Sequence, residues 1–207
     1  MQLHLVIGQN DCKYFSINHI VELAIKGGIT HVQLREKEIP YNEFIACAKS
    51  LSKQLKPYSI PLIINDSIEV ALAINAEGIH LGQKDLSPLK ARTLLGTDKI
   101  IGLTVETPEQ AQEANHLPIN YIGVGPIYVT SSKKDAPPIL GISVLETICK
   151  ITSHPVIAIG GINEINASAT INAGAQGIAV ISAICAAKNP RLITKRLKNN
   201  IEINYGI

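Results

Sequence analysis

Residues 61–111 read PLIINDSIEVALAINAEGIHLGQKDLSPLKARTLLGTDKIIGLTVETPEQA, and their alternating pattern determines the predicted fold. Short apolar runs alternate with amphipathic stretches of helical period, in the order Pro61–Ile64, Ile68–Ile74, Gly78–Leu81, Pro88–Leu95 and Ile100–Leu103. Near-continuous apolar strands between helices are typical of a parallel sheet that is covered on both faces. The stretch therefore predicts a repeated β/α unit.

The same alternation continues toward both ends of the chain. The further predicted strands are Leu3–Ile7, His31–Arg35, Tyr121–Val124, Val156–Ile159 and Gly177–Ile181. The further predicted helices are Asn18–Ala24, Tyr41–Leu55, Pro108–Ala114, Ser143–Ile151, Glu164–Ala173 and Arg191–Asn200. An open doubly wound sheet also fits this order, but eight β/α units in 207 residues favour closure. We expect residues 1–207 to form a single-domain (β/α)8 TIM barrel of the α/β class, because no linker divides them.

Local signals mark several helix ends. Ser87 and Thr107 each place a capping hydroxyl before a proline, and Gln110 completes a possible capping box with Thr107. Helices should stop at the glycines 27, 28 and 174.

Composition excludes several classes of protein. The chain is 46% hydrophobic and 17% charged, as a folded domain should be, and its net charge of +2 argues against a nucleic-acid partner. The four scattered cysteines predict neither disulfides nor a Cys-based metal site. The short N-terminal run is unlike a signal peptide, and no apolar run reaches the length of a membrane span, so a cytoplasmic location is expected. Barrel helices are amphipathic with or without a partner, so the pattern is neutral on oligomeric state.

The first chemical cluster is His31-Val-Gln-Leu-Arg-Glu-Lys37, at the end of the second predicted strand. Strand periodicity puts Gln33, Arg35 and Lys37 on one face, and the apolar side chains between them should face the helices. Two cations at the mouth of a barrel are costly unless an anion meets them. The cluster predicts an anion site, and a solvated loop is the alternative.

A second cluster follows the third and fourth strands. Asp66 and Asp85 lie after neighbouring strands, so their carboxylates can converge on one Mg²⁺ ion, which takes one or two carboxylates and fills its shell with water and phosphate oxygens. The alternative is that each aspartate caps the following helix. His80, between them in sequence, is expected to be a hydrogen-bonded core residue rather than a ligand.

Two further clusters suit phosphate. Residues 123–140, GVGPIYVTSSKKDAPPIL, place hydroxyls and lysines on a long loop that could close over a ligand, although such a loop is often merely solvated. Gly160-Gly161 and Ser182 follow strands seven and eight, the usual phosphate-binding loops of these barrels. Arg35, Lys37 and Lys133 would balance a diphosphate beside the cation, and amides at Gly161 and Ser182 would bind a monophosphate. Two phosphate sites indicate two substrates.

The ordered motifs QLREK, IND, GIHLGQKDL, IGLTVETPEQA, GVGPIYVTSSKKDAPP, AIGGI and VISAI resemble those of the thiamine phosphate synthase family from about residue 31 to residue 185. That family joins a hydroxymethylpyrimidine diphosphate to a thiazole phosphate and releases pyrophosphate. The resemblance implies a transferase with Mg²⁺ as its cofactor and small-molecule substrates.

The resemblance also implies residue roles. Arg35, Lys37, Lys133 and Thr104 would be catalytic, and Asp66 and Asp85 would hold the metal. The pyrimidine diphosphate would be bound by Gln33, Arg35, Lys37, Asn65 and Lys133, with Thr104 beside the ring. The thiazole phosphate would be bound by Thr130, Ser132, Gly161, Ile181 and Ser182. Leu34, Glu36 and Ser131 complete the expected substrate-binding set.

Several positions depart from the common family pattern. Thr104 stands where the family usually has Ser, and Ser132 stands where it usually has Thr, so both positions keep a hydroxyl. Val129 replaces a usual proline, and Glu106 stands where a His is frequent. The first strand ends Ile7-Gly8-Gln9-Asn10, without the usual acidic residue. None of these changes removes a charged group from the proposed site.

The available groups predict a dissociative substitution. No Ser–His–Asp or Cys–His arrangement suggests a covalent intermediate. Mg²⁺ and the three cations would stabilise the departing diphosphate, and the strand-six loop would exclude water. The alternatives are the related thiazole tautomerase, another phosphate-binding barrel enzyme, and a non-catalytic ligand sensor.

Overall fold

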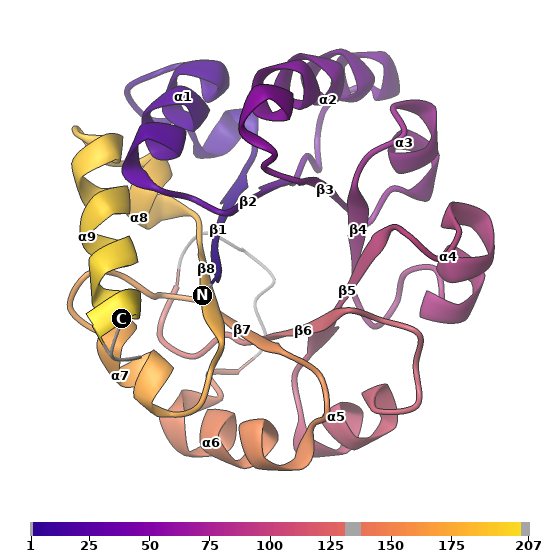
Figure 1. Cartoon of the computed structure of the whole chain (residues 1–207), viewed down its shortest axis with the longest axis vertical. Helices are drawn as coiled ribbons and strands as arrows, with labels where there is room; N and C mark the ends of the chain where they lie inside the picture. The colour runs from indigo at the N-terminus through magenta and orange to yellow at the C-terminus, as the bar shows by residue number, and fades with distance from the viewer. Residues whose placement is uncertain (1, 131–137, 204–207) are drawn as a thin grey trace.

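The computed structural model describes residues 2–130 and 138–203, and in these residues eight parallel strands close into a ring surrounded by helices (Figure 1). The strands are β1 (Gln2–Ile7), β2 (His31–Leu34), β3 (Leu62–Asn65), β4 (Gly78–Leu81), β5 (Ile100–Val105), β6 (Tyr121–Val124), β7 (Val156–Ile159) and β8 (Gly177–Val180). Each strand pairs with its neighbour in sequence, and β1 pairs with β8, with Leu3 opposite Ile178, to close the barrel. The predicted TIM barrel is confirmed.

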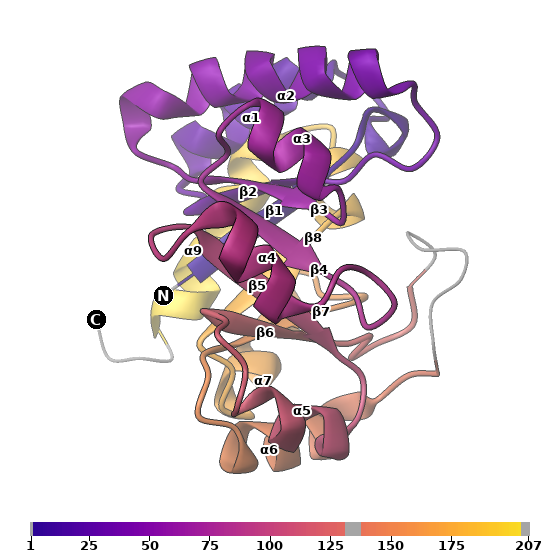
Figure 2. The same ribbon diagram turned by 90° about the vertical axis from the view of Figure 1, so that its right-hand side faces the viewer.

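The helices lie outside this ring, as Figure 1 and the side view in Figure 2 both show. They are α1 (Ile17–Gly27), α2 (Tyr41–Leu55), α3 (Ile68–Ala73), α4 (Pro88–Leu95), α5 (Pro108–Ala114), α6 (Gly141–Ile151), α7 (Ala167–Asn172), α8 (Ser182–Cys185) and α9 (Pro190–Ile203). Two 3₁₀ turns, η1 (Gln9–Asp11) and η2 (Lys56–Tyr58), follow β1 and α2. None of these helices is both long and apolar enough to cross a membrane.

Most helix signals act as predicted. The Ser87 and Thr107 hydroxyls accept the backbone N–H groups of Lys90 and Gln110, and Gly28 ends α1 in the left-handed conformation. The capping box is formed only in part, because the Gln110 side chain accepts the N–H of Glu106 instead of that of Thr107.

Helix α7 begins at Ala167 rather than at the predicted Glu164. Residues 164–166 precede α7 as a turn, in which Asn166 Oδ1 accepts the Asn163 N–H at 2.8 Å and Asn163 Oδ1 accepts the Ile165 N–H at 2.8 Å. Asparagine side chains compete in this way with helical hydrogen bonds. The short α8, which follows β8, was not predicted at all.

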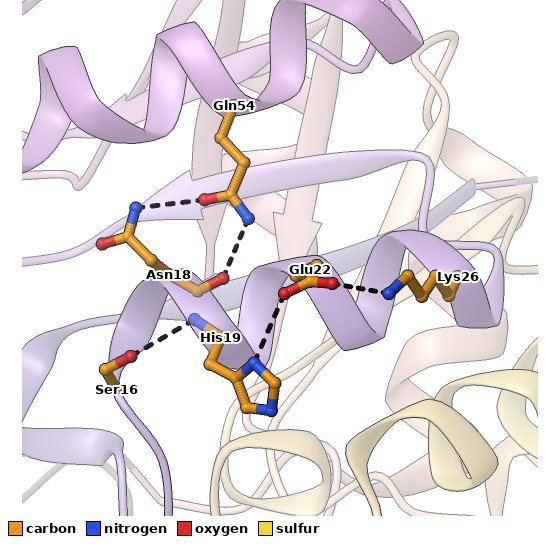
Figure 3. Close-up of polar contacts among 6 residues, drawn as sticks. All are labelled: Ser16, Asn18, His19, Glu22, Lys26 and Gln54. Atoms are coloured by element: carbon orange, nitrogen blue, oxygen red, sulfur yellow. Dashed lines mark hydrogen bonds and ion pairs between the residues drawn. The ribbon is translucent and has the colours of Figure 1, made fainter.

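The N-terminal part of α1 is joined to α2 by side-chain hydrogen bonds (Figure 3). Asn18 Nδ2 donates to Gln54 Oε1 at 3.1 Å, and Gln54 Nε2 donates back to the Asn18 carbonyl at 2.8 Å. Along α1, Glu22 bridges His19 and Lys26. These polar groups satisfy one another on the outer surface and do not line the barrel cavity.

Two apolar layers hold the fold together. The larger lies between sheet and helices and contains the outward-facing side chains of the strands, such as Val32, Leu34 and Ile64. The smaller lies inside the barrel and is built on Val6, Tyr121, Ile157 and Ala179. The interior cluster is small because glycines and polar residues take many inward positions, and this leaves space for a ligand.

Candidate active site

A cavity of about 570 Å³ opens at the C-terminal ends of the strands. This volume suits a small organic ligand, and this end of a β/α barrel is where active sites form. Of the predicted site residues, those lining the cavity are Gln33, Arg35, Lys37, Asn65, Asp66, Asp85, Thr104, Thr130 and Ile181. Residues from separate β/α units therefore meet around one space.

The end of β2 behaves as its alternation predicts. Gln33, Arg35 and Lys37 line the cavity, whereas Leu34 is fully buried against the helices. Leu34 was expected to bind substrate, and this expectation is corrected for its side chain, which faces away from the cavity. The predicted strand His31–Arg35 is one residue too long, because β2 ends at Leu34 and Arg35 is the first residue after it.

Glu36 has a bracing contact beside the cavity. Its Oε1 accepts the Gln9 N–H at 2.8 Å and so ties the loop after β1 to the end of β2. Burial and the neighbouring Asp11 raise the pKa of Glu36. Glu36 is not among the residues that line the cavity, and its expected contact with substrate stays a prediction.

Asp66, on the rim, is constrained through both its backbone and its side chain. Its backbone is left-handed, with φ of 64°, an uncommon conformation for a residue with a side chain. The backbone is held by a hydrogen bond from its N–H to the His80 carbonyl at 2.8 Å, and Asn65 Nδ2 donates to Asp66 Oδ1 at 2.7 Å. Lys37 forms an ion pair with Asp66 Oδ2. A strained residue held by this many contacts fits a functional position.

Asp66 and Asp85 approach each other across β3 and β4. Burial raises the pKa of Asp66, Asp85 raises it further, and Lys37 opposes the rise. Asp85 is fixed by its own turn, since its Oδ2 accepts the Gly82 N–H at 2.7 Å. The described residues contain no group of three His, Cys, Asp or Glu side chains that could hold a metal. Two converging carboxylates suit a hard cation that takes its other ligands from water and phosphate oxygens, as Mg²⁺ does.

His80 joins two residues inside the barrel. Its Nδ1 lies 2.9 Å from Tyr121 Oη and its Nε2 lies 2.9 Å from Thr104 Oγ1. Burial lowers the pKa of His80 to about 4, so the imidazole is neutral at pH 7. His80 is thus the hydrogen-bonded interior residue that the sequence predicts, and it also holds the Thr104 hydroxyl at the cavity wall.

The loops after β6 and β7 touch at the opposite side of the cavity. Tyr128 N–H donates to the Gly160 carbonyl at 3.0 Å. Gly160 and Gly161 are both left-handed, and a Cβ on Gly161 would lie 2.8 Å from Tyr128 Cβ. The two loops are packed too closely for any larger residue there. Gly160 and Ile181 line the cavity. The residues that follow them directly in sequence, Gly161 and Ser182, do not line it.

Part of the expected site lies outside the described residues. Ser131, Ser132 and Lys133 belong to residues 131–137, so their predicted roles stay predictions. Among the described residues, Thr130 lines the cavity and Val129 is exposed.

Several cavity residues were not predicted. Tyr121, Gln83, Lys84, His4 and Val6 all line it, and Glu106 lies there as well. The signal for Tyr121 was present, because Tyr121 and Gly123 alternate with apolar residues along β6 and so share the inward face. His4 and Val6 follow the same rule on β1, but an apolar strand gives no sign that one end of it reaches a ligand site.

The chain is similar in sequence to known proteins. Residues 3–184 match the protein family described as thiamine monophosphate synthase. Thiamine-phosphate synthase of Clostridium acetobutylicum is 48% identical over 187 residues, covering 90% of this chain and 88% of that protein. The corresponding protein of Albidiferax ferrireducens is 43% identical over 202 residues, covering 98% of this chain and 92% of that protein.

Solved structures show the same likeness. A thiamine phosphate pyrophosphorylase from Pyrococcus furiosus has a TM-score of 0.88 at 32% identity, covering 98% of this chain and 96% of that one. A 3-hexulose-6-phosphate synthase has a TM-score of 0.71 at 15% identity and shares the fold alone. The similar proteins do not favour the tautomerase alternative, because the relatives at 42–48% identity carry the synthase name.

Proposed function

The chain belongs to the thiamine monophosphate synthase family and is a transferase, and from this premise we propose how its rim cavity carries out the reaction. The substrates are a hydroxymethylpyrimidine diphosphate and a hydroxyethylthiazole phosphate. The bond between the pyrimidine methylene carbon and the diphosphate oxygen breaks, and the pyrophosphate leaves with the electron pair. The thiazole nitrogen then forms the new C–N bond, which gives thiamine phosphate.

One observation carries the proposal. The paired carboxylates of Asp66 and Asp85 lie beside the cations Arg35 and Lys37 at the mouth of a cavity that could hold a pyrimidine. A carboxylate whose pKa is raised by a second carboxylate, as that of Asp66 is by Asp85, favours a divalent cation, and neighbouring cations favour an anion. The arrangement suits a diphosphate that is bound together with its metal. A site for a neutral ligand would need neither the paired carboxylates nor the two cations.

Asp66 and Asp85 would hold Mg²⁺, which supplies charge neutralisation for the departing pyrophosphate. Lys37 is already paired with Asp66, and on substrate binding its ammonium group would be shared with a phosphate oxygen. Arg35 would add a second charged donor, and Lys133 a third by the family resemblance. Together these side chains stabilise the charge that builds on the leaving group.

The other residues orient the partners. Gln33 and Thr104 would position the pyrimidine, and Asn65 would hold Asp66 in place through its 2.7 Å hydrogen bond while lying beside the diphosphate. Thr130, Ser132, Gly161, Ile181 and Ser182 would bind the thiazole phosphate on the β6–β8 side of the cavity. This places the two phosphate groups at opposite sides and the two reacting rings between them. We also propose a cytoplasmic location, which rests on the sequence alone.

The proposal is tested by a coupling assay on the purified protein. Both substrates are supplied with Mg²⁺, and thiamine phosphate is detected after oxidation to the fluorescent thiochrome. We expect product only when both substrates are present, released pyrophosphate in equal amount, and loss of activity in EDTA that excess Mg²⁺ restores. Absence of product from folded protein contradicts the proposal, and product formation that EDTA leaves unchanged contradicts the metal site.

A further inference from the structure

The turn between β4 and α4 presents to the cavity a lysine that the proposed reaction does not yet use. Lys84 lines the cavity beside Asp85, and its side chain is exposed at the cavity mouth. Lys37, which also lines the cavity, forms an ion pair with Asp66. The Lys84 ammonium group forms no ion pair or hydrogen bond with any of residues 2–130 and 138–203. Within the described part of the chain, its charge is therefore available to a ligand.

Both chain neighbours of Lys84 are held by hydrogen bonds. Gln83 Nε2 donates to the Thr104 carbonyl on β5 at 2.5 Å. Asp85 Oδ2 accepts the Gly82 N–H at 2.7 Å, and the Asp85 N–H donates to the Gly82 carbonyl at 3.3 Å. The backbone at Lys84 is therefore fixed between two tied residues. Because of this, ordering its side chain on a ligand costs less entropy than ordering a lysine on a loose loop.

The order of the strands places Lys84 and the cations that follow β2 on opposite sides of β3. Strand β3, which ends beside Asp66, pairs with β2 on one side and with β4 on the other. Arg35 and Lys37 follow β2, and Lys84 follows β4. Neighbouring strands lie about 4.8 Å apart, so the ends of β2 and β4 are separated by about 10 Å. An anion above the end of β3 can be contacted from both sides by these long side chains.

The charges around the cavity indicate which anion fits. Among the described residues, those that line the cavity and carry a charge at pH 7 are three cations and three carboxylates: Arg35, Lys37, Lys84, Asp66, Asp85 and Glu106. A divalent cation adds two positive charges and a diphosphate brings roughly three negative ones, which leaves a deficit of about one that Lys133 would meet by the family resemblance. Without Lys84 one negative charge stays unbalanced, and unpaired charge is costly in a partly desolvated site. The charge balance of a metal-bound diphosphate here therefore includes Lys84.

We propose that Lys84 is a diphosphate-binding residue, which donates from the β4 side to the non-bridging oxygens that Arg35 and Lys37 approach from the β2 side. The departing pyrophosphate is then held between the two groups of cations while its charge builds. Lys84 lies outside the set of substrate-binding residues that the family resemblance implies. The inference deepens the proposed function, on which it rests for the identity of the occupant.

The first test measures the binding of inorganic pyrophosphate with Mg²⁺ by isothermal titration calorimetry. Lys84→Met keeps a long side chain and removes its charge, so it should bind pyrophosphate about tenfold more weakly than the wild type. Lys84→Arg should retain most of the affinity. Lys90→Met, on an exposed lysine of α4 that does not line the cavity, is the matched control and should equal the wild type. Equal affinities of Lys84→Met and the wild type overturn the inference.

The second test follows the same variants in the coupling assay. Lys84→Met should lower kcat/KM for the pyrimidine diphosphate about tenfold, with KM for the thiazole phosphate unchanged, because that substrate would bind on the β6–β8 side. At saturating substrates, the Mg²⁺ concentration that gives half of the maximal rate should not rise, since removing a cation beside Asp85 does not repel another cation. A merely structural role for Lys84 gives a different pattern. Damage to the turn would displace Asp85, so the Mg²⁺ requirement would rise and Lys84→Arg would lose as much activity as Lys84→Met, and either result overturns the inference.

The binding test needs no turnover, so it separates the inference from the proposed function. A wild-type protein that binds pyrophosphate with the help of Lys84 but does not couple contradicts the proposed function alone. A wild-type protein that couples, and whose affinity for pyrophosphate is the same in Lys84→Met, contradicts the inference alone. A wild-type protein that neither couples nor binds pyrophosphate contradicts both.

Discussion

At the scale of single residues, the acidic side chains of the rim are held in an arrangement that is unfavourable without a ligand. Asp66 combines a left-handed backbone with a pKa raised by burial and by Asp85. A bound cation removes both the repulsion and part of the desolvation cost. The sequence predicts which carboxylates meet, because neighbouring strand ends lie together, but the Asp66 conformation and its Lys37 ion pair depend on loop geometry that has no local signature.

Replacing Asp85 tests the cation site. Asp85→Asn keeps an oxygen that can accept the Gly82 N–H, so the turn should persist and the free energy of unfolding should change little. Turnover should fall at least about a hundredfold, because the metal loses a charged ligand. Asp98→Asn, on an exposed aspartate away from the cavity, should match the wild type. Near-normal turnover of Asp85→Asn at low Mg²⁺ would remove Asp85 from the site.

His31 predicts how stability depends on pH. Burial lowers the pKa of His31 from the ordinary value of 6.5 to about 4. At a pH between these two values, His31 is protonated in the unfolded chain and neutral in the folded protein. The free energy of unfolding should therefore fall as pH drops from 6.5 toward 4, by about 2 kcal/mol from His31 between pH 7 and pH 5. Urea unfolding at the two values measures it.

His31→Phe isolates this contribution. The ring can still stack on His4, whose centroid lies 4.1 Å from that of His31, but it cannot titrate. The variant should lose about 2 kcal/mol less than the wild type between the two pH values. Equal losses in both proteins would show that His31 does not titrate differently on folding.

At the scale of elements, strands and helix starts follow from the sequence more closely than helix lengths do. The expected bounds of α2, α4, α5, β4, β6 and β7 match the structure. Ser-Pro and Thr-Pro starts are local signals, so α4 and α5 begin as predicted. The turn before α7 was missed because the hydrogen bonds of Asn163 and Asn166 compete with a helical pattern that the spacing also allows.

The cap of α5 gives a prediction for one element. Thr107 Oγ1 accepts the Gln110 N–H at 3.2 Å, so Thr107→Ala should lower the free energy of unfolding by about 1 kcal/mol. Thr93→Ala, inside α4 and exposed, should change it by less than about 0.5 kcal/mol. Denaturant unfolding of both variants decides the matter, and equal stability of Thr107→Ala and wild type would contradict the capping role.

Strand β5 gives a second prediction. Gly102→Ala places a methyl group against Tyr121 and His80 and should cost about 1–3 kcal/mol by overpacking. It should also reduce kcat/KM for the pyrimidine diphosphate, because the hydrogen bonds of His80 to Tyr121 and Thr104 must shift. Ile101→Val, one residue earlier and facing the helices, should lower stability by about 1 kcal/mol with kcat/KM unchanged. Thermal unfolding and the coupling assay on both variants separate packing from positioning.

At the scale of the whole molecule, barrel closure brings together residues that are far apart in sequence. Gln33, Thr104 and Tyr121 come from three different β/α units and meet only because the strands close with a fixed register. The number of β/α units predicts the barrel, and strand periodicity predicts which side chains point inward. The hydrogen bonds that join Tyr121, His80 and Thr104 could not be predicted, because contacts across the interior depend on the stagger between strands, which no single strand encodes.

The central claim is that the carboxylates of Asp66 and Asp85 hold the catalytic cation at the mouth of this cavity. Anomalous diffraction from crystals grown with Mn²⁺, pyrophosphate and thiamine phosphate tests it most directly, after Mn²⁺ has been shown to support coupling. We predict one strong anomalous peak within coordination distance of both carboxylates, with the pyrimidine beside Thr104 and Gln33. No peak between the two carboxylates, or a peak at another part of the molecule, would contradict the account.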